Sequence, residues 1–285
     1  WLPAAVPGCV HTHLRRHYLI PDPFSGAPAR SLQWIERLDW RYRTRFDADA
    51  ELVAHAEIDL VFEGLDTLAT VSLNGAVVGR TENMFCGYRF PVRQHLKLGE
   101  NTLEIVFAST LGYLRAHQSW QPVKERNDPV GGRSRIRKEQ CQYSWDWGPR
   151  FVTCGVWRPA RLEARSTNRI ESVRVEQTHQ PDGSVLLAFE PELARADSAA
   201  RFAGTVSLHG QPVAKIENLQ SKLAQPALWW PAGQGAQPLY EVRVELLDAA
   251  GAVLDTWTRR IGLRRIELVR EKDAAGESFF FRVNG

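Results

Sequence analysis

Residues 70–78 read Thr-Val-Ser-Leu-Asn-Gly-Ala-Val-Val, and this stretch decides the fold class. Asn74-Gly75 separates two runs of apolar and β-branched residues. Asn-Gly is the preferred pair for a two-residue hairpin turn, because both central residues of that turn need a positive φ. The stretch therefore predicts two antiparallel strands joined by a tight turn.

Alternating apolar residues recur on both sides of this hairpin. They are Ile58, Leu60 and Phe62 before it, and Leu103, Ile105 and Phe107 after it. Residues 151–162 predict one or two further strands, interrupted near Pro159. One short helix is predicted near the start, capped by Thr12 and running to His17. The first part of the chain is therefore predicted to be a large β-sandwich.

After about residue 164 the predicted strands become shorter and more evenly spaced. They cover 173–175, 185–189, 202–208, 213–216, 240–246 and 253–261. Turn residues separate them, at His209-Gly210 and over 248–251. This spacing is typical of an immunoglobulin-like sandwich of about 100 residues, so the chain is predicted to be all-β with two successive sandwiches.

The composition is that of an ordinary globular chain. It has 285 residues with 44% apolar and 24% charged residues, and a formal net charge of +3. Both signs of charge are mixed along the sequence, which does not favour nucleic acid as a partner. No apolar run approaches the roughly 20 residues that span a bilayer, so no membrane partner is predicted. Four cysteines without a Cys-x-x-Cys pair support neither a zinc site nor a dithiol redox site.

The densest run of aromatic and polar residues is QCQYSWDWGPR over 140–150. Gly148-Pro149 predicts a turn directly after Trp-Asp-Trp, which places Asp146 on or beside a loop. A carboxylate can accept hydrogen bonds from paired sugar hydroxyls while an indole covers the C–H face of the ring. Trp145 and Asp146 are therefore candidate sugar-binding residues. On composition alone the commoner interpretation is that both indoles are core and Asp146 caps a turn.

Two other groups stay open as candidates. His11, His13 and His17 raise the question of a metal, but no carboxylate or cysteine supports them nearby, and ordinary helix-start histidines are favoured. The basic residues between Lys124 and Lys138 raise the question of phosphate, but the phosphate-loop spacing is absent and a packed polar loop is favoured. No nucleophile motif or marked carboxylate pair is present. Counting alone leaves a carboxylate pair among the 33 acidic residues open, but no residue is marked as catalytic, and we predict no metal and no cofactor in this chain.

Strings along the whole chain match one known pattern. They are VPGCVHT (6–12), LIPDPF (19–24), DWRYR (39–43), FEGLDT (62–67), LNG (73–75), GRTENMF (79–85), YSWDWGPR (143–150), LWWP (228–231), PLY (238–240), RIGLR (260–264) and FRVNG (281–285). In these strings the chain resembles the N-terminal, non-catalytic part of β-mannosidases of glycoside hydrolase family 2. The strings over 20–24 and 145–149 are specific to the mannosidase branch and its near relatives.

The resemblance implies a jelly-roll, galactose-binding-like sandwich over 1–165 and an immunoglobulin-like sandwich over 166–271. It implies that 272–285 start a catalytic (β/α)8 barrel that is absent from this chain. The family's acid/base lies in an Asn-Glu dipeptide, and none occurs here. In the family the Trp-Asp-Trp loop reaches into the barrel mouth. The resemblance therefore implies that Asp146 contacts sugar hydroxyls and that Trp145 lines the pocket.

We therefore expect the accessory domains of an exo-acting, retaining β-mannosidase, inactive without the barrel. The implied partners are a β-mannoside or manno-oligosaccharide and the barrel of the same protein. The alternatives are a stand-alone carbohydrate-binding module, or the same domains of a related β-glucosaminidase, β-galactosidase or β-glucuronidase. The sequence begins at Trp1 without a signal-type segment, and both ends suggest a piece of a longer chain, so no compartment is predicted.

Overall fold

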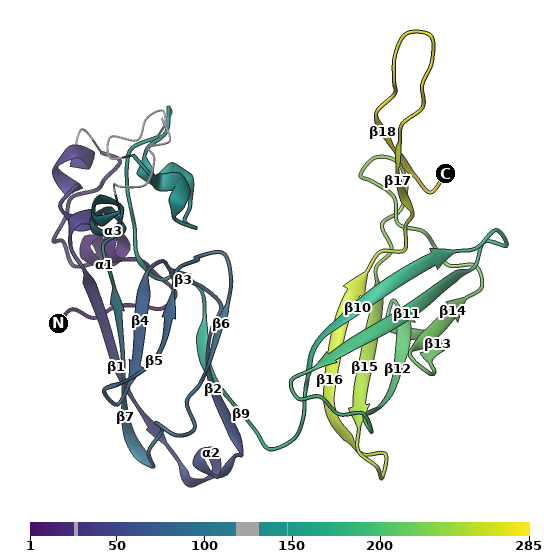
Figure 1. The fold of residues 1–285 in the computed structure, drawn as a ribbon, viewed down its shortest axis with the longest axis horizontal. Helices are drawn as coiled ribbons and strands as arrows, with labels where there is room; N and C mark the ends of the chain where they lie inside the picture. The colour runs from purple at the N-terminus through teal and green to yellow at the C-terminus, as the bar shows by residue number, and fades with distance from the viewer. Residues whose placement is uncertain (26–27, 118–130, 147) are drawn as a thin grey trace. The chain divides into compact units, whose positions relative to one another are not determined.

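The chain folds into two compact units. The computed structural model describes residues 1–25, 28–117, 131–146 and 148–285. Unit 1 comprises residues 1–166 and unit 2 residues 167–285, and each is built from antiparallel sheets (Figure 1). The prediction of an all-β chain made of two successive sandwiches is confirmed.

Unit 1 is a sandwich of a four-stranded sheet and a three-stranded sheet, with one short additional strand pair. The four-stranded sheet has the order β1-β7-β4-β5, the three-stranded sheet the order β6-β2-β9, and β3 pairs with β8. The strands are β1 (Trp40–Ala48), β2 (Glu57–Phe62), β3 (Leu65–Asp66), β4 (Ala69–Leu73), β5 (Ala76–Thr81), β6 (Tyr88–Pro91), β7 (Gly99–Phe107), β8 (Gly155–Val156) and β9 (Ala160–Arg165).

The predicted hairpin joins β4 to β5. Asn74 and Gly75 have φ angles of 52° and 85°, as this turn requires. The Asn74 side chain also accepts a hydrogen bond from the Thr102 amide at 2.9 Å, which ties the turn to β7. Apolar residues of β2, β4 and β7 fill the core between the sheets. They are Ile58, Leu60, Phe62, Val71, Leu73, Ile105 and Phe107.

Helices lie at the two ends of the unit 1 sandwich. At one end are α1 (Val10–Arg16) and α3 (Thr110–Ala116), and at the other is α2 (Ala50–Ala54) (Figure 1). The 3-10 helices are η1 (Pro28–Leu32), η2 (Ile35–Arg37), η3 (Arg133–Arg135) and η4 (Gln140–Tyr143). No helix in the part of the chain that the structure describes is long and apolar enough to cross a membrane.

The helix prediction was wrong in its start and in its number. Helix α1 begins at Val10, and Thr12 is its third residue rather than its cap. The Thr12 hydroxyl donates to the Cys9 carbonyl at 2.7 Å, so Thr12 stabilises the start from inside the helix. Helices α2 and α3 were not predicted. Each is short and is capped by a side chain, that of Asp49 or Ser109, which accepts from a backbone amide in the first turn.

Unit 2 is a second sandwich of two antiparallel sheets, with the orders β10-β11-β14 and β13-β12-β15-β16. The strands are β10 (Ile170–His179), β11 (Val185–Leu193), β12 (Arg201–Leu208), β13 (Gln211–Ile216), β14 (Gln220–Leu223), β15 (Tyr240–Leu247) and β16 (Val253–Ile261). The alternation predicted for β15 is confirmed, because Tyr240, Val242, Val244 and Leu246 are all buried. Strand β14 was missed, because four residues are too few to show a period.

A two-stranded ladder follows the second sandwich. Strands β17 (Ile266–Val269) and β18 (Phe280–Val283) pair antiparallel, with Ile266 opposite Val283. Phe279 and Phe281 are 71% and 67% exposed. The assignment of residues 272–285 to the start of a barrel stays a prediction.

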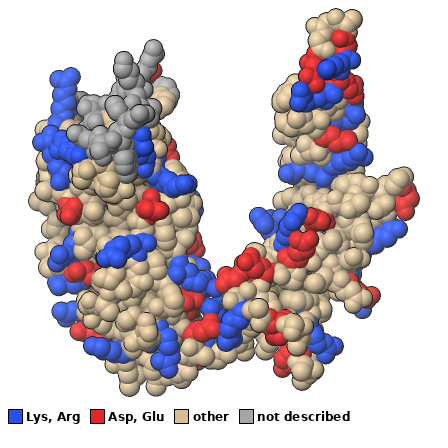
Figure 2. Space-filling model, in the orientation of Figure 1, with Lys and Arg blue, Asp and Glu red and all other residues tan. Residues whose placement is uncertain are grey.

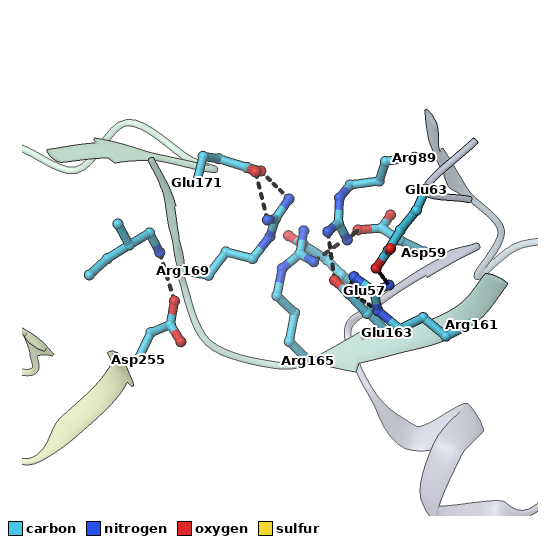
Figure 3. A network of polar contacts seen from close by, with 11 residues as sticks. Glu57, Asp59, Glu63, Arg89, Arg161, Glu163, Arg165, Arg169, Glu171 and Asp255 are labelled. Carbon is cyan, nitrogen blue, oxygen red and sulfur yellow. Dashed lines mark hydrogen bonds and ion pairs between the residues drawn. The ribbon is translucent and has the colours of Figure 1, made fainter. Parts of the chain in front are cut away.

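The three-stranded sheet of unit 1 carries a network of ion pairs on the face away from the core (Figure 3). Asp59 accepts hydrogen bonds from Arg89 at 3.0 Å and from Arg165 at 2.9 Å, and its side chain is 7% exposed. Arg89 also donates to Glu163 at 2.6 Å. Figure 2 shows that Lys and Arg side chains gather near the end of unit 1 that carries α1 and α3, whereas positive and negative side chains are mixed over its sheets.

Candidate functional site

Trp145 and Asp146 lie in the segment that follows η4 and leads to β8. In Figure 1 the teal chain after η4 lies at the end of unit 1 that carries α1 and α3. Trp145 is half-buried and Asp146 is exposed. The Gly148 amide donates to the Trp145 carbonyl at 3.4 Å, and these two residues form an isolated bridge. This closes the turn that Gly148-Pro149 predicts, so Asp146 lies in a tight turn at the protein surface.

The residue before Trp145 has an unusual backbone conformation. Ser144 has φ 106° and ψ 150°, a region that only glycine adopts readily. The buried Arg133 donates from Nη1 to the Ser144 carbonyl at 2.9 Å. Its guanidinium carbon also lies 5.0 Å from the centre of the Trp145 ring. One buried side chain therefore contacts both the strained residue and the indole beside Asp146.

Packing accounts for several other aromatic residues of this segment. Tyr143 is fully buried in a small cluster with Leu114, Ile136 and Val152. Phe151 makes an edge contact with the ring of His11 at 5.7 Å between centroids. Tyr143 is therefore a core residue, whereas Trp145, for which a core position was the alternative, is half-buried. Trp120 and Trp147 lie outside the described residues.

A buried ion pair joins Lys138, which precedes η4, to Asp66 of β3. The side chains of Lys138 and Asp66 are 0% and 3% exposed, and the Lys138 ammonium donates to Asp66 Oδ1. Lys138 also donates to the Thr153 carbonyl at 2.8 Å. The Thr153 hydroxyl lies 2.9 Å from Asp66 Oδ2, and the Thr153 amide donates to Gln142 Oε1 at 3.0 Å. These contacts connect Lys138 and Thr153, the two ends of the segment 138–153, to β3.

This buried charge changes the titration of its surroundings. Burial lowers the pKa of Lys138, and the Asp66 carboxylate opposes that change. Burial also lowers the pKa of His11 to about 4, and the positive charge of Lys138 adds to the effect. His11 is therefore neutral at pH 7, and its Nδ1 atom is buried without a hydrogen-bond partner among the described residues.

A second buried ion pair holds the later half of the segment. Arg150 Nε lies 3.1 and 3.0 Å from the two carboxylate oxygens of Glu36, which belongs to η2. Arg150 also donates from Nη1 to the Tyr143 carbonyl at 2.9 Å, and its own carbonyl accepts from Gln33 at 2.9 Å. The Trp145-Asp146 turn is therefore held from both sides by charged groups that are themselves buried.

The basic run was the second open candidate. Two of its cations, Arg133 and Lys138, are buried and engaged in the internal contacts above. Lys124 and Arg126 lie outside the described residues. The residues that are described therefore give no support to a phosphate site at Lys138 or Arg133, because neither guanidinium nor ammonium faces solvent.

The histidines near the start make contacts within the chain. His13 lies 3.0 Å from the Tyr42 hydroxyl through Nδ1 and 2.8 Å from the Ala5 carbonyl through Nε2. His17 Nε2 lies 2.6 Å from the Pro3 carbonyl. Over residues 1–25, 28–117, 131–146 and 148–285, no three His, Cys, Asp or Glu side chains are grouped so that they could hold a metal ion.

Sequence reasoning missed Asp66, Thr153 and Glu36. Asp66 lies 72 residues from Lys138 in the sequence, and no local pattern connects the two. The FEGLDT string contains Asp66 but contributed only to the resemblance. A lysine next to a buried cluster gives no sequence signal of its own, because lysine is usually exposed.

Two hollows occur elsewhere on the molecule. One of about 540 Å³ lies in unit 1 between the start of the chain and Trp157, and one of about 520 Å³ lies in unit 2 beside β16 and β17. Neither is lined by Trp145 or Asp146.

Comparison with known protein families gives two matches. Residues 1–158 match the family described as "Glycosyl hydrolase 2 galactose-binding domain-like". Residues 166–264 match the family described as "Glycosyl hydrolases family 2". The two matches follow one another along the chain and agree with the jelly-roll and immunoglobulin-like sandwiches expected from the resemblance.

Curated relatives and solved structures agree with these matches. The chain is 34% identical to Beta-mannosidase B of Aspergillus oryzae over all of its length, and 38% identical to Beta-mannosidase B of Thermothelomyces thermophilus over 98% of it. It superposes on the crystal structure of a β-D-mannosidase from Dictyoglomus thermophilum with a TM-score of 0.90, at 35% identity over 99% of the chain. A β-glucuronidase from Ruminococcus gnavus, with a TM-score of 0.60 and 19% identity over 86% of the chain, shares the fold.

The chain is much shorter than these proteins. It covers 35% of the Aspergillus oryzae protein, 34% of the Thermothelomyces thermophilus protein and 36% of the Dictyoglomus thermophilum chain. The similarity therefore spans nearly all of this chain but about one third of each relative.

Proposed function

Because this chain belongs to glycoside hydrolase family 2, we propose that it forms the sugar-binding and accessory part of an exo-acting, retaining β-mannosidase. Such an enzyme removes terminal β-D-mannose from the non-reducing end of β-mannosides and manno-oligosaccharides. The catalytic barrel of the same protein, outside these 285 residues, is the proposed partner of this chain. We refer to the longer protein below as the complete protein.

The observation that supports this proposal most is the turn at Trp145-Asp146. Asp146 is exposed, and the half-buried indole of Trp145 lies directly before it. A carboxylate can accept two hydroxyl hydrogen bonds of one pyranose, and an aromatic ring covers the C–H face of the same sugar. Asp146 is the proposed hydroxyl-binding residue, and Trp145 is the proposed pocket wall.

The chemistry is assigned to the part of the protein outside this chain. A retaining glycosidase needs two carboxyl groups about 5–5.5 Å apart, one as the nucleophile and one as the acid and then the base. Both carboxyl groups are proposed to belong to the barrel, which residues 272–285 begin. This chain would orient the terminal mannose and close the pocket beyond it, which restricts attack to the chain end.

The isolated chain is expected to hold half of a site. Asp146 is exposed and Trp145 is half-buried in the chain by itself. We expect the purified 285 residues to hydrolyse no aryl β-mannoside. Calorimetry with mannose and manno-oligosaccharides should show no binding, because the contacts on the barrel side are missing. Turnover by the chain would show that its own residues catalyse the reaction. Clear binding heat would favour a stand-alone carbohydrate-binding module.

Asp146 can be tested in the complete protein. Asp146→Ala should lower kcat/KM for an aryl β-mannoside about 10- to 100-fold, because hydrogen bonds to a charged group contribute about 1.5–3 kcal/mol. Asp182→Ala is the matched control, since Asp182 is an exposed aspartate at a turn of unit 2. Equal kinetics for the two variants would show that Asp146 does not bind substrate.

The substrate class needs its own assay. The complete protein should hydrolyse aryl β-mannosides, and should release β-D-mannose with retained configuration. β-Glucuronides, β-galactosides and β-glucosaminides should be poor substrates. A preference for one of these three would identify the chain as the accessory part of a different family 2 glycosidase.

A further inference from the structure

The buried pair of Lys138 and Asp66 is not explained by stability alone. Removing an ammonium and a carboxylate from water costs several kcal/mol for each ion, and their attraction often does no more than offset that cost. Apolar residues of similar volume at such positions are often as stabilising or more so. Both side chains are almost fully buried. A role of the pair in holding the surrounding backbone in place would explain their presence.

The pair joins the two ends of one segment to a single carboxylate. Lys138 and Thr153 are 15 positions apart, and both bind Asp66 at the end of β3. Lys138 binds Oδ1, and the Thr153 hydroxyl lies 2.9 Å from Oδ2. Lys138 also donates directly to the Thr153 carbonyl at 2.8 Å, so each of the three residues contacts the other two. The separation of the two ends is therefore determined by the two oxygens of one carboxylate.

The turn with Trp145 and Asp146 lies between these ends. Gln142 Oε1 accepts a hydrogen bond from the Thr153 amide at 3.0 Å, so the residues before and after the turn are also connected to each other. The hydrogen bonds to the Asp66 carboxylate are charge-assisted, and such bonds are short and are strengthened by a low dielectric. A segment held at both ends has far fewer conformations available to its tip than a free loop has.

We propose that Lys138, Asp66 and Thr153 form a positioning clamp that holds the Trp145-Asp146 turn in the geometry that receives the sugar. None of the three residues is assigned a contact with substrate. This inference rests on the proposed function of Asp146, and it adds a requirement that the sugar-binding carboxylate be held rigidly from beneath.

The test uses a variant that leaves no buried charge unpaired. Lys138→Met/Asp66→Asn removes both charges together and keeps the side-chain volumes similar, so the sandwich should still fold. The matched control is Lys222→Met/Asp182→Asn. It removes an exposed Lys–Asp pair in unit 2, whose side chains are 59% and 61% exposed. Thr153→Val is a milder variant that leaves the ion pair and removes a hydroxyl that lies 2.9 Å from both Asp66 Oδ2 and Gln142 Oε1.

The first measurement is amide hydrogen exchange in this chain, which requires no substrate. Peptides covering 139–150 should exchange at least 10-fold faster in Lys138→Met/Asp66→Asn, while peptides from β2 and β11 keep their rates. Thr153→Val should accelerate the same peptides about 3-fold and serves alone if the double variant does not fold. Unchanged exchange over 139–150 would overturn the clamp.

The second measurement is a mutant cycle on kcat/KM in the complete protein. The double variant should lose at least 10-fold on its own but less than 2-fold in an Asp146→Ala background, because the clamp acts through Asp146. If the double variant lowers kcat/KM by the same factor with and without Asp146→Ala, the clamp does not act through Asp146 and the positioning role is wrong. If Asp146→Ala has no effect while exchange is accelerated, the proposed function fails and the clamp remains as a structural element.

Discussion

Ser144 adopts a backbone conformation that is costly for any residue with a side chain. Its carbonyl is held by a buried arginine, and the residue after it is Trp145. Strain of this kind persists only where the surroundings impose it. At the scale of a residue, the conformation of Ser144 is therefore imposed by its surroundings.

Replacing Ser144 by glycine should release this strain. Ser144→Gly is expected to raise the free energy of unfolding by about 1 kcal/mol, since relief of strain exceeds the entropy that glycine adds to the unfolded chain. Urea denaturation measures the difference. The control is Ser72→Gly in β4, which lies at a register shift of the β4–β5 pair but has no positive φ, and where glycine should cost about 0.5–1 kcal/mol. Equal losses in both variants would mean that Ser144 is not strained.

His11 makes stability depend on pH. Its pKa is lowered to about 4 in the folded chain, against 6.5 for the exposed group. Because the unfolded chain binds a proton at His11 more readily than the folded chain, the folded state loses stability as the pH falls from 6.5 to 4. The free energy of unfolding should drop by about 3 kcal/mol over this range. His11→Gln should remove that part of the pH dependence in urea titrations at pH 7, 5.5 and 4. His209→Asn, an exposed turn histidine, is the control. If the free energy of unfolding depends on pH in the same way in His11→Gln and in the unmodified chain, protonation of His11 does not cause the loss of stability.

At the scale of an element, charge covers one face of the three-stranded sheet. Asp59 is buried beneath Arg89 and Arg165 (Figure 3), although its alternation with Ile58 and Leu60 places it on the outer face. Burial tends to raise the pKa of Glu163, but its hydrogen bonds from Arg89 and Arg161 outweigh that effect and lower the pKa. The network therefore covers the sheet face with fixed ion pairs.

Asp59 should be the most sensitive position of this network. Asp59→Ala is expected to lower the free energy of unfolding by about 3 kcal/mol, because it leaves two partly buried arginines without their shared carboxylate. Glu63→Ala, whose side chain is 46% exposed in its pair with Arg161, should change it by less than about 1 kcal/mol. Equal changes in the free energy of unfolding for the two variants, measured by urea denaturation, would show that the burial of Asp59 does not contribute to stability.

The sequence predicted those elements whose causes are local. The Asn74-Gly75 hairpin and the alternation in β15 were predicted because turn chemistry and side-chain period act over a few neighbouring residues. Helix α1 was placed three residues too late, because Thr12 resembles a cap and acts from inside the helix. The turn at Asp146 was predicted from Gly148-Pro149. Its support was not, because Asp66 and Glu36 come from distant parts of the chain.

At the scale of the whole molecule, the first of two sandwiches carries both candidate binding residues, Trp145 and Asp146. The family matches cover both sandwiches, and the relatives are about three times as long as this chain. The roles of Trp145 and Asp146 came from the residues and the resemblance, and they stay predictions. What the structure adds is that the Asp146 turn is exposed at its tip and anchored by buried charges at its base.

The contact between Asp146 and a sugar hydroxyl can be measured directly with modified substrates. The kcat/KM of the complete protein and of its Asp146→Ala variant would be compared on an aryl β-mannoside and on its monodeoxy analogues. If Asp146 binds a hydroxyl, removing that hydroxyl should cost the unmodified protein 10-fold or more and the variant almost nothing. If every deoxy analogue loses the same factor in both proteins, Asp146 does not touch the sugar.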